Sequence, residues 1–268
     1  MRKVSVLALA VFAFWTADAR AIEIKNVRGT YGPFGATRPA NKMLPGDIYM
    51  LCFDITDLAI DAKSGLAKYE ITLEVFDPKG KQVVKDQSKK GVVVALGGNT
   101  VPESVQLLLG VDQAPGKYKA IVTIQDPDTK KSKQVLHELE LVAQDFGFIH
   151  VSAPAVGLTG QDYMVEYSLV GMTRDANKIP KITVTLTILD AAGKPTLAEP
   201  SISKFPEDLP AELRPNVPKQ EVARLGSPMY LNRPGRYTVQ IEARDELSKT
   251  KKTVQFSYTL TVVDAAGK

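Results

Sequence analysis

The sequence has very few cysteines and histidines, the residues that form disulfides and that occur in many catalytic and metal sites. It contains one cysteine, one tryptophan and two histidines in 268 residues. One cysteine cannot form an intramolecular disulfide, so the chain is not a disulfide-stapled scaffold. We expect Cys52 to be a buried strand residue, because it lies in an apolar segment and free cysteine is among the most buried residue types. A nucleophile or an intermolecular bridge is the alternative.

Catalytic motifs are missing as well. The chain has no Gly-x-Ser-x-Gly elbow and no phosphate-binding glycine loop, and His137 and His150 lie in or beside predicted strands. Two scattered histidines and one cysteine do not make a zinc site. We therefore predict no catalytic residues, no cofactor and no metal site, and expect that the chain is not an enzyme.

Acidic residues cluster at two places without the spacing of an EF-hand. Asp54, Asp57 and Asp61 lie close together, and Asp126 with Asp128 begins a hairpin turn. A calcium site needs six or more oxygen ligands from several loops. We interpret these residues as solvated turn acids, with a calcium site between the domains as the alternative.

No long hydrophobic run occurs, and the longest apolar segment is at the N-terminus. Arg2 and Lys3 precede an apolar run over 4–15, and small residues follow up to Ala21. This pattern is typical of a secretory signal peptide cleaved after Ala19 or Ala21, because about 20 apolar residues are needed to span a bilayer. We expect an exported protein, periplasmic, cell-surface or secreted, with no membrane span in the mature chain.

A strong excess of charge of either sign is also absent. Without residues 1–21 the chain has 31 basic and 29 acidic residues. So small a balance does not indicate a nucleic-acid or membrane surface. The basic clusters at 85–90 and 249–252 lack interleaved aromatic residues and are interpreted as solubilising or edge-protecting charges.

What the sequence does contain is an internal repeat. Three blocks recur in the same order with shifts of 113 to 119 residues: 46–50 with 160–164, 68–81 with 181–194, and 115–118 with 234–237. Two copies of one domain explain this order. We place the first domain at 22–143 and the second at 144–268, and the short linker favours a semi-rigid, end-to-end pair.

The repeated blocks alternate apolar and polar residues, as half-buried strands do, and end in Asp-x-x-Gly turns. Helix candidates are few, and the best of them, 207–213, contains a proline. Many strands joined by short turns indicate an all-β fold, with two tandem antiparallel immunoglobulin-like β-sandwiches after the signal peptide.

The segment Pro-Gly-x-Tyr opens a strand in both copies, at 115–118 and 234–237. It resembles the segment before the penultimate strand of fibronectin-type and other immunoglobulin-like domains. Together with Pro45-Gly46-Asp47 and the turn at 77–81, it is also similar to macroglobulin-type sandwich domains. The resemblance implies that Tyr118 and Tyr237 are structural corner tyrosines. The cysteine pair and core tryptophan of antibody domains are absent, and so is the thioester motif of macroglobulins.

Two irregular segments are candidates for contact with a partner. Eight of the seventeen prolines lie in 195–234, and copy two is six residues longer than copy one in this region. Such an insert is either a stiff cover over a sheet edge or a preorganised contact surface. The second segment is 31–39. The candidate contact residues are Tyr31, Phe34, Arg38, Pro206, Pro210 and Pro215.

These observations favour a non-catalytic exported protein of the cell envelope that binds a protein or another envelope component, or acts as a spacer. One alternative is an accessory subunit or inhibitor that grips an exported enzyme through the proline-rich segment. A carbohydrate-associated module is less favoured, because the mature chain has no tryptophan for a sugar platform.

Overall fold

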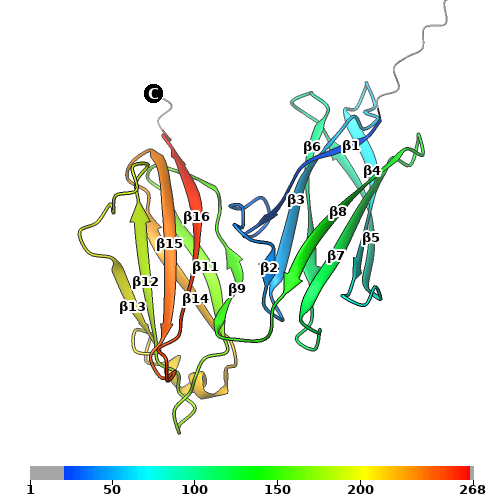
Figure 1. Ribbon diagram of the computed structural model, residues 1–268. Helices are drawn as coiled ribbons and strands as arrows, with labels where there is room; N and C mark the ends of the chain where they lie inside the picture. The colour runs from blue at the N-terminus through cyan, green and yellow to red at the C-terminus, as the bar shows by residue number, and fades with distance from the viewer. Residues whose placement is uncertain (1–20, 266–268) are drawn as a thin grey trace, which may run out of the picture.

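The computed structural model describes residues 21–265, which form two tandem β-sandwiches (Figure 1). This confirms the predicted all-β fold class. Of the predicted signal peptide, only Ala21 lies within the described residues. Residues 21–265 contain one helical element, the 3-10 helix η1 (Arg214–Lys219), and no helix that is long and apolar enough to cross a membrane.

The first sandwich packs a sheet of order β1-β3-β6 on a sheet of order β2-β8-β7-β4-β5. Its strands are β1 (Glu23–Thr30), β2 (Lys42–Met43), β3 (Ile48–Thr56), β4 (Leu66–Phe76), β5 (Gln82–Val93), β6 (Thr100–Leu108), β7 (Gly116–Gln125) and β8 (Ser132–Leu141). All neighbours are antiparallel except β2 and β8, which are parallel.

The second sandwich has the same topology, with sheets of order β9-β11-β14 and β10-β16-β15-β12-β13. Its strands are β9 (Gly147–Ser152), β10 (Val156–Leu158), β11 (Asp162–Val170), β12 (Ile182–Leu189), β13 (Ser201–Phe205), β14 (Ala223–Tyr230), β15 (Gly235–Asp245) and β16 (Thr253–Val263). Here too one pair, β10 and β16, is parallel. Each strand of the first sandwich therefore has a counterpart eight strands later.

The strands form because their apolar residues recur with period two, so that one face of each sheet is buried. In β4 the buried residues are Ala67, Tyr69, Ile71, Leu73 and Val75, which alternate with half-buried or exposed polar ones. The inward residues form two separate cores, one for each sandwich.

Edge strand β5 has charged side chains along its length, as edges that resist pairing with other chains do. Lys85 and Lys89 pair with Glu74 and Glu70 of the adjacent strand β4, and Lys90 pairs with Glu103 of β6 in the facing sheet. The cluster at 85–90 is therefore part of an edge strand.

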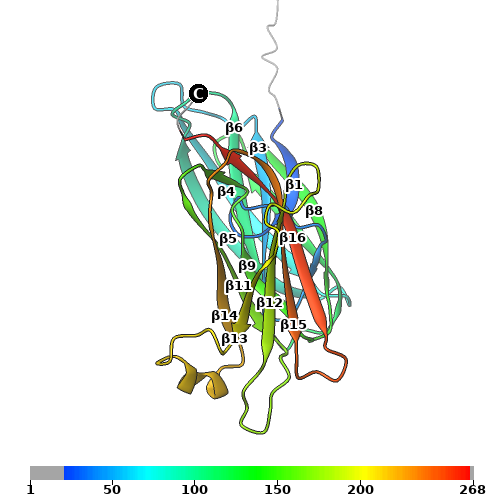
Figure 2. The ribbon, with the colours of Figure 1, turned by 90° about the vertical axis from the view of Figure 1, so that its left-hand side faces the viewer.

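The two sandwiches lie side by side, and the connection after Leu141 crosses between their lower ends (Figures 1 and 2). The expectation of an end-to-end pair was wrong. The loop at 31–38 reaches across and bonds to the residue that follows β9: the N–H of Ala36 donates to the carbonyl of Ala153, and the N–H of Ala153 donates to that of Tyr31. A short linker fixes the spacing of two units but not their angle, which these contacts set.

Candidate binding site

The two corner tyrosines show how the copies differ. Tyr118 is 0% exposed, and its hydroxyl donates a hydrogen bond of 2.8 Å to the carbonyl oxygen of Ala114. Burial raises the pKa of this tyrosine, with a further increase from the charge of Asp77. The ring therefore closes the lower end of the first core.

Tyr237 occupies the equivalent position, yet it is only half-buried. Its hydroxyl donates to the carbonyl oxygen of Arg233 at 3.2 Å and accepts a hydrogen bond of 3.0 Å from Nε of Arg233. The guanidinium lies 5.8 Å from the ring centroid. Tyr237 thus keeps the corner position of Tyr118 but not its full burial.

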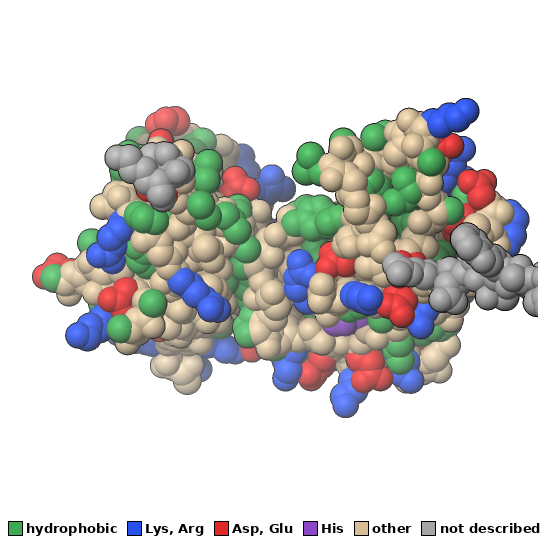
Figure 3. Space-filling view, turned by 90° about the horizontal axis from the view of Figure 1, so that it is seen from above, with side chains coloured by type: hydrophobic (Ala, Val, Ile, Leu, Met, Phe, Trp, Pro, Cys, Tyr) green, Lys and Arg blue, Asp and Glu red, His purple; other side chains and the backbone are tan. Residues whose placement is uncertain are grey.

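The space beside Tyr237 is a cavity of about 560 Å³ at the upper end of the second sandwich. We call it the upper cavity. It lies between the two sheets, and hydrophobic side chains reach the surface around this end of the molecule (Figure 3). Its apolar lining is formed by Leu186, Ile188, Leu197, Met229, Leu231, Tyr237, Leu260 and Val262.

The equivalent end of the first sandwich is filled. There β5 continues from the turn, and Val83 and Val84 pack against the core, with Val84 opposite Val75 in the sheet. Pro78 also lies over the corner, because a Cβ added at Gly116 would meet its Cγ at 2.6 Å. Ala191 stands at the position of Pro78 in copy two, which removes this cover.

In copy two the edge strand is interrupted. Thr196 still bonds to the carbonyl of Ile188, but β13 begins only at Ser201. In the first sandwich Leu73 pairs with Asp86, 13 positions later in the chain. Its counterpart Leu186 pairs with Ser201, 15 positions later. The two additional residues loop out, and Leu197, the counterpart of Val84, is left 59% exposed at the rim. The upper cavity therefore results from a local insertion.

The cavity has one charged residue in its lining, Arg233. Nε of Arg233 is bonded to Tyr237, and its two terminal nitrogens form no hydrogen bond or ion pair within residues 21–265. Asp190 interacts with this arginine electrostatically, but its Oδ1 accepts the N–H groups of Ala192 and Lys194. An apolar space with a cation at its mouth can hold an apolar group that carries a negative charge.

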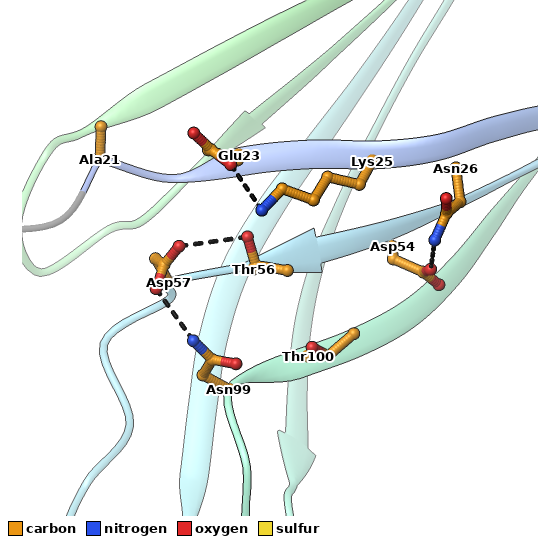
Figure 4. A pocket seen from close by; sticks show the side chains of 9 residues that line it. All are labelled: Ala21, Glu23, Lys25, Asn26, Asp54, Thr56, Asp57, Asn99 and Thr100. Atoms are coloured by element: carbon orange, nitrogen blue, oxygen red, sulfur yellow. Dashed lines mark hydrogen bonds and ion pairs between the residues drawn. The ribbon is translucent and has the colours of Figure 1, made fainter.

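A second depression, of about 550 Å³, lies at the upper end of the first sandwich and is polar (Figure 4). Its side chains bond to one another: Lys25 pairs with Glu23 at 2.7 Å, Asn26 donates to Asp54 at 2.6 Å, and Asn99 donates to Asp57 at 2.9 Å. Residues before Ala21 lie outside the described part of the chain. This depression therefore does not define a site.

The predicted contact residues at 31–39 have different surroundings. Tyr31 is 7% exposed, and its ring packs 5.5 Å from that of Phe256 in the second core. The guanidinium of Arg38 bonds to Asp47 at 2.8 Å and lies over the Tyr31 ring, with only 9% of its side chain exposed. Tyr31 and Arg38 thus contact other parts of the same chain, which corrects their interpretation as contacts for a partner. Phe34, the third candidate in this segment, is 50% exposed.

The proline-rich segment contributes to both ends of the second sandwich. Residues 206–222 form a cap at its lower end, away from the upper cavity (Figure 2). Val217 of η1 is buried against the core, and Arg214 donates to the carbonyls of Leu209 and Glu207. Pro206 is half-buried, whereas Pro210 and Pro215 are exposed. The helix candidate at 207–213 forms turns.

Other residues named from the sequence have structural surroundings. Cys52 is 1% exposed, which confirms its predicted burial. His137 bonds through Nε2 to the Tyr49 hydroxyl, and burial lowers its pKa. The ring of His150 bonds through Nε2 to the carbonyl of Gly46, and the backbone N–H of His150 donates to Oδ1 of Asp47. Among residues 21–265 no three histidine, cysteine or acidic side chains are grouped to hold a metal ion.

Comparison with known proteins bears on the fold alone. No protein-family model and no curated protein matches the chain. A red sea bream transglutaminase structure is similar at 11% identity and a TM-score of 0.27, over 90% of this chain and 31% of that one. The dimeric latent PorU of Porphyromonas gingivalis is similar at 9% identity and a TM-score of 0.37, over 96% and 21%. This chain thus spans under a third of either neighbour.

One of these likenesses contradicts the expectation that the chain is not an enzyme, because a transglutaminase is an enzyme. That expectation rested on missing motifs alone, and missing motifs do not exclude an enzyme. At such low identity and TM-score the likeness assigns no activity, reaction or active-site residue to this chain.

Proposed function

We propose that the chain is an exported binding protein of the cell envelope, and that the upper cavity is its binding element. One observation carries this proposal. The two copies share their topology, yet the end that is closed by Val84 and Pro78 in the first sandwich is open in the second. The opening leaves Ile188 and Tyr237 half-buried and Leu197 exposed, and apolar surface that stays in contact with water costs stability unless a ligand covers it.

The remaining features fit this function. Residues 1–21 have the pattern of a signal peptide, which supports export to a periplasmic, cell-surface or secreted location. The strand order and the Tyr118 corner support immunoglobulin-like domains of the fibronectin or macroglobulin type. In the immunoglobulin fold the loops cluster at the two ends of the sandwich, and the upper cavity lies at one of these ends.

The binding proposal can be tested with an envelope extract and a cavity-filling variant. Ile188→Trp fills the upper cavity, and Ile202→Trp is the matched control, because Ile202 is 58% exposed and points away from Phe205, which faces the core. We expect the extract to raise the melting temperature of the wild type and of the control but not of Ile188→Trp. Equal protection of all three proteins would contradict the proposal.

Export has its own test. The intact mass of the protein recovered from the envelope or the medium should lack 19 or 21 N-terminal residues. Mature protein that retains Met1 would contradict export and leave the cavity proposal unaffected.

A second candidate function rests on the lower cap. Arg174 donates to the carbonyls of Lys178 and Val217, which holds the cap in place, while Leu213 remains 49% exposed. A rigid surface with an exposed leucine could grip a protein, as an accessory subunit or inhibitor would. In a pull-down from an envelope extract, Leu213→Asp should then lose a partner that Ile188→Trp retains.

A further inference from the structure

We infer that the upper cavity binds the chain of a long-chain carboxylate, with Arg233 at its anionic end. The inference rests on the proposed function and specifies the ligand class. It combines the apolar lining between the sheets with the position of the only charged residue at the mouth.

The lining favours an alkyl chain over a polar ligand. Leu260 and Val262 of β16 and Leu186 of β12 are buried core residues, at most 9% exposed, and they form the inner wall. The volume of about 560 Å³ is within the range of ligand pockets, roughly 300–1,000 Å³. Each methylene group that enters should strengthen binding about fourfold, by the usual free energy of apolar burial.

The charge at the mouth favours an anion. Nε of Arg233 donates to the Tyr237 hydroxyl, and its two terminal nitrogens have no hydrogen bond among residues 21–265. A guanidinium binds a carboxylate through two parallel hydrogen bonds. The remaining polar side chains of the rim, Thr196, Ser201 and Asn232, are uncharged.

A strand of a partner protein is a poorer occupant. The backbone of Ile188 already bonds to Thr196, and the N–H of Lys204 in edge strand β13 donates to Asp208. Across the cavity, edge strand β14 contains Pro228, which has no N–H to donate. The backbone around the cavity therefore offers few positions for strand addition.

The experiment is a calorimetric titration of the full chain with dodecanoate, below the concentration at which it forms micelles. Dodecyltrimethylammonium, decanoate and dodecanol are measured alongside. The variants are Arg233→Gln, Ile188→Trp and Leu197→Asp, and the controls are Arg236→Gln, an exposed arginine outside the cavity, and Ile202→Trp. Leu197→Asp serves if Ile188→Trp fails to fold, because Leu197 is exposed and not needed for the core.

We expect dodecanoate to bind the wild type and both controls equally, and Arg233→Gln about tenfold more weakly, as for loss of a charged hydrogen bond. Decanoate should bind more weakly than dodecanoate. Dodecanol, which carries no charge, should bind Arg233→Gln and the wild type with the same affinity. Dodecyltrimethylammonium should bind most weakly of all. Ile188→Trp and Leu197→Asp should lose binding.

The inference fails if dodecanoate does not bind, if Arg233→Gln binds it as the wild type does, or if the cationic amphiphile binds equally well. If dodecanoate fails while the envelope extract still protects the wild type and not Ile188→Trp, only the ligand class is wrong. If the extract protects Ile188→Trp as well, the proposed function itself is wrong.

Discussion

At two equivalent turns a buried carboxylate holds a hairpin together. Asp126 is 2% exposed and accepts the N–H groups of Asp128, Thr129 and Ala59. Asp245 is 1% exposed and accepts those of Leu247, Ser248 and Thr173. The interpretation of Asp126 as a solvated turn acid is therefore wrong. Its carboxylate turns inward because three backbone donors would otherwise lack an acceptor.

Asp126→Ala should destabilise the first sandwich by about 3 kcal/mol, because it leaves three backbone donors without a partner. Asp128→Ala is the control, since Asp128 is exposed. Denaturant unfolding of both variants measures the difference. A loss for Asp128→Ala as large as that for Asp126→Ala would show that the carboxylate of Asp126 is not what holds the turn.

The same residue predicts a dependence on pH. Burial raises the pKa of Asp126, but the backbone N–H groups of Thr129, Asp128 and Ala59 outweigh it and hold the pKa below the ordinary 3.8. A lowered pKa means that the stabilisation is present above the unfolded value and is lost as the pH falls through the folded one. In Asp126→Asn the stability of the first sandwich should therefore fall less between pH 4 and pH 2 than in the wild type, which denaturant unfolding at the two pH values measures.

The corner tyrosines should differ in their effect on stability. Tyr118→Ala removes a fully buried ring and should cost about 3–5 kcal/mol, and Tyr118→Phe about 1 kcal/mol for the bond to Ala114. Tyr237→Ala should cost only about 2 kcal/mol, because its ring is half-buried beside a cavity. Calorimetry of the three variants tests this, and equal costs for the two alanine variants would contradict the difference in burial.

Among the elements, the lower cap shows how a proline-rich insert becomes ordered. Its 3-10 helix η1 has Pro215 near its start, where a missing N–H costs nothing, and it places Val217 in the second core. Arg174 and Arg214 satisfy carbonyls of the cap that would otherwise lack donors. Residues 206–222 thus cover the lower end of the sandwich and not a sheet edge.

Val217→Ala should lower the stability of the second sandwich by about 1–2 kcal/mol, because it removes buried methyl groups. Pro215→Ala, at an exposed position of the same helix, should change it by less than about 0.5 kcal/mol. Denaturant unfolding measures both. If the two variants behave alike, the cap is not anchored by Val217.

At the scale of the whole molecule, the two cores are separate but not independent. Tyr31 and Ala36 belong by sequence to the first domain, yet they pack in the core of the second. Arg38, Asp47 and His150 add a buried ion pair and two hydrogen bonds at the same junction. These contacts couple the two sandwiches, because separating them would leave a buried charge without its partner, which costs free energy.

Tyr31→Ala should therefore destabilise the second sandwich, by about 3 kcal/mol, although the mutation lies in the first domain of the sequence. Phe34→Ala, in the same loop but half exposed, is the control. Calorimetry resolves the effect if the two sandwiches unfold in separate transitions. If Tyr31→Ala lowers the unfolding temperature of the first sandwich and leaves that of the second unchanged, the loop does not dock on the second sandwich in solution.

The sequence by itself determined the strands, their repetition and the fold class, because period-two alternation and turn residues are local properties of the chain. It also indicated which residues carry each turn, such as Tyr118 and the Asp-x-x-Gly segments. The division into copies came from the spacing of those blocks alone.

Only the tertiary structure decided which of these residues are available for binding. Tyr31 and Arg38 look like surface contacts in the sequence, but a loop crosses to the other sandwich and buries them. Conversely, Ile188 looks like an ordinary strand residue and Leu197 like part of the irregular proline-rich segment. The upper cavity beside them depends on two looped-out residues and on Ala191 in place of a proline. Exposure and cavities arise where segments distant in sequence meet, so local patterns could not predict them.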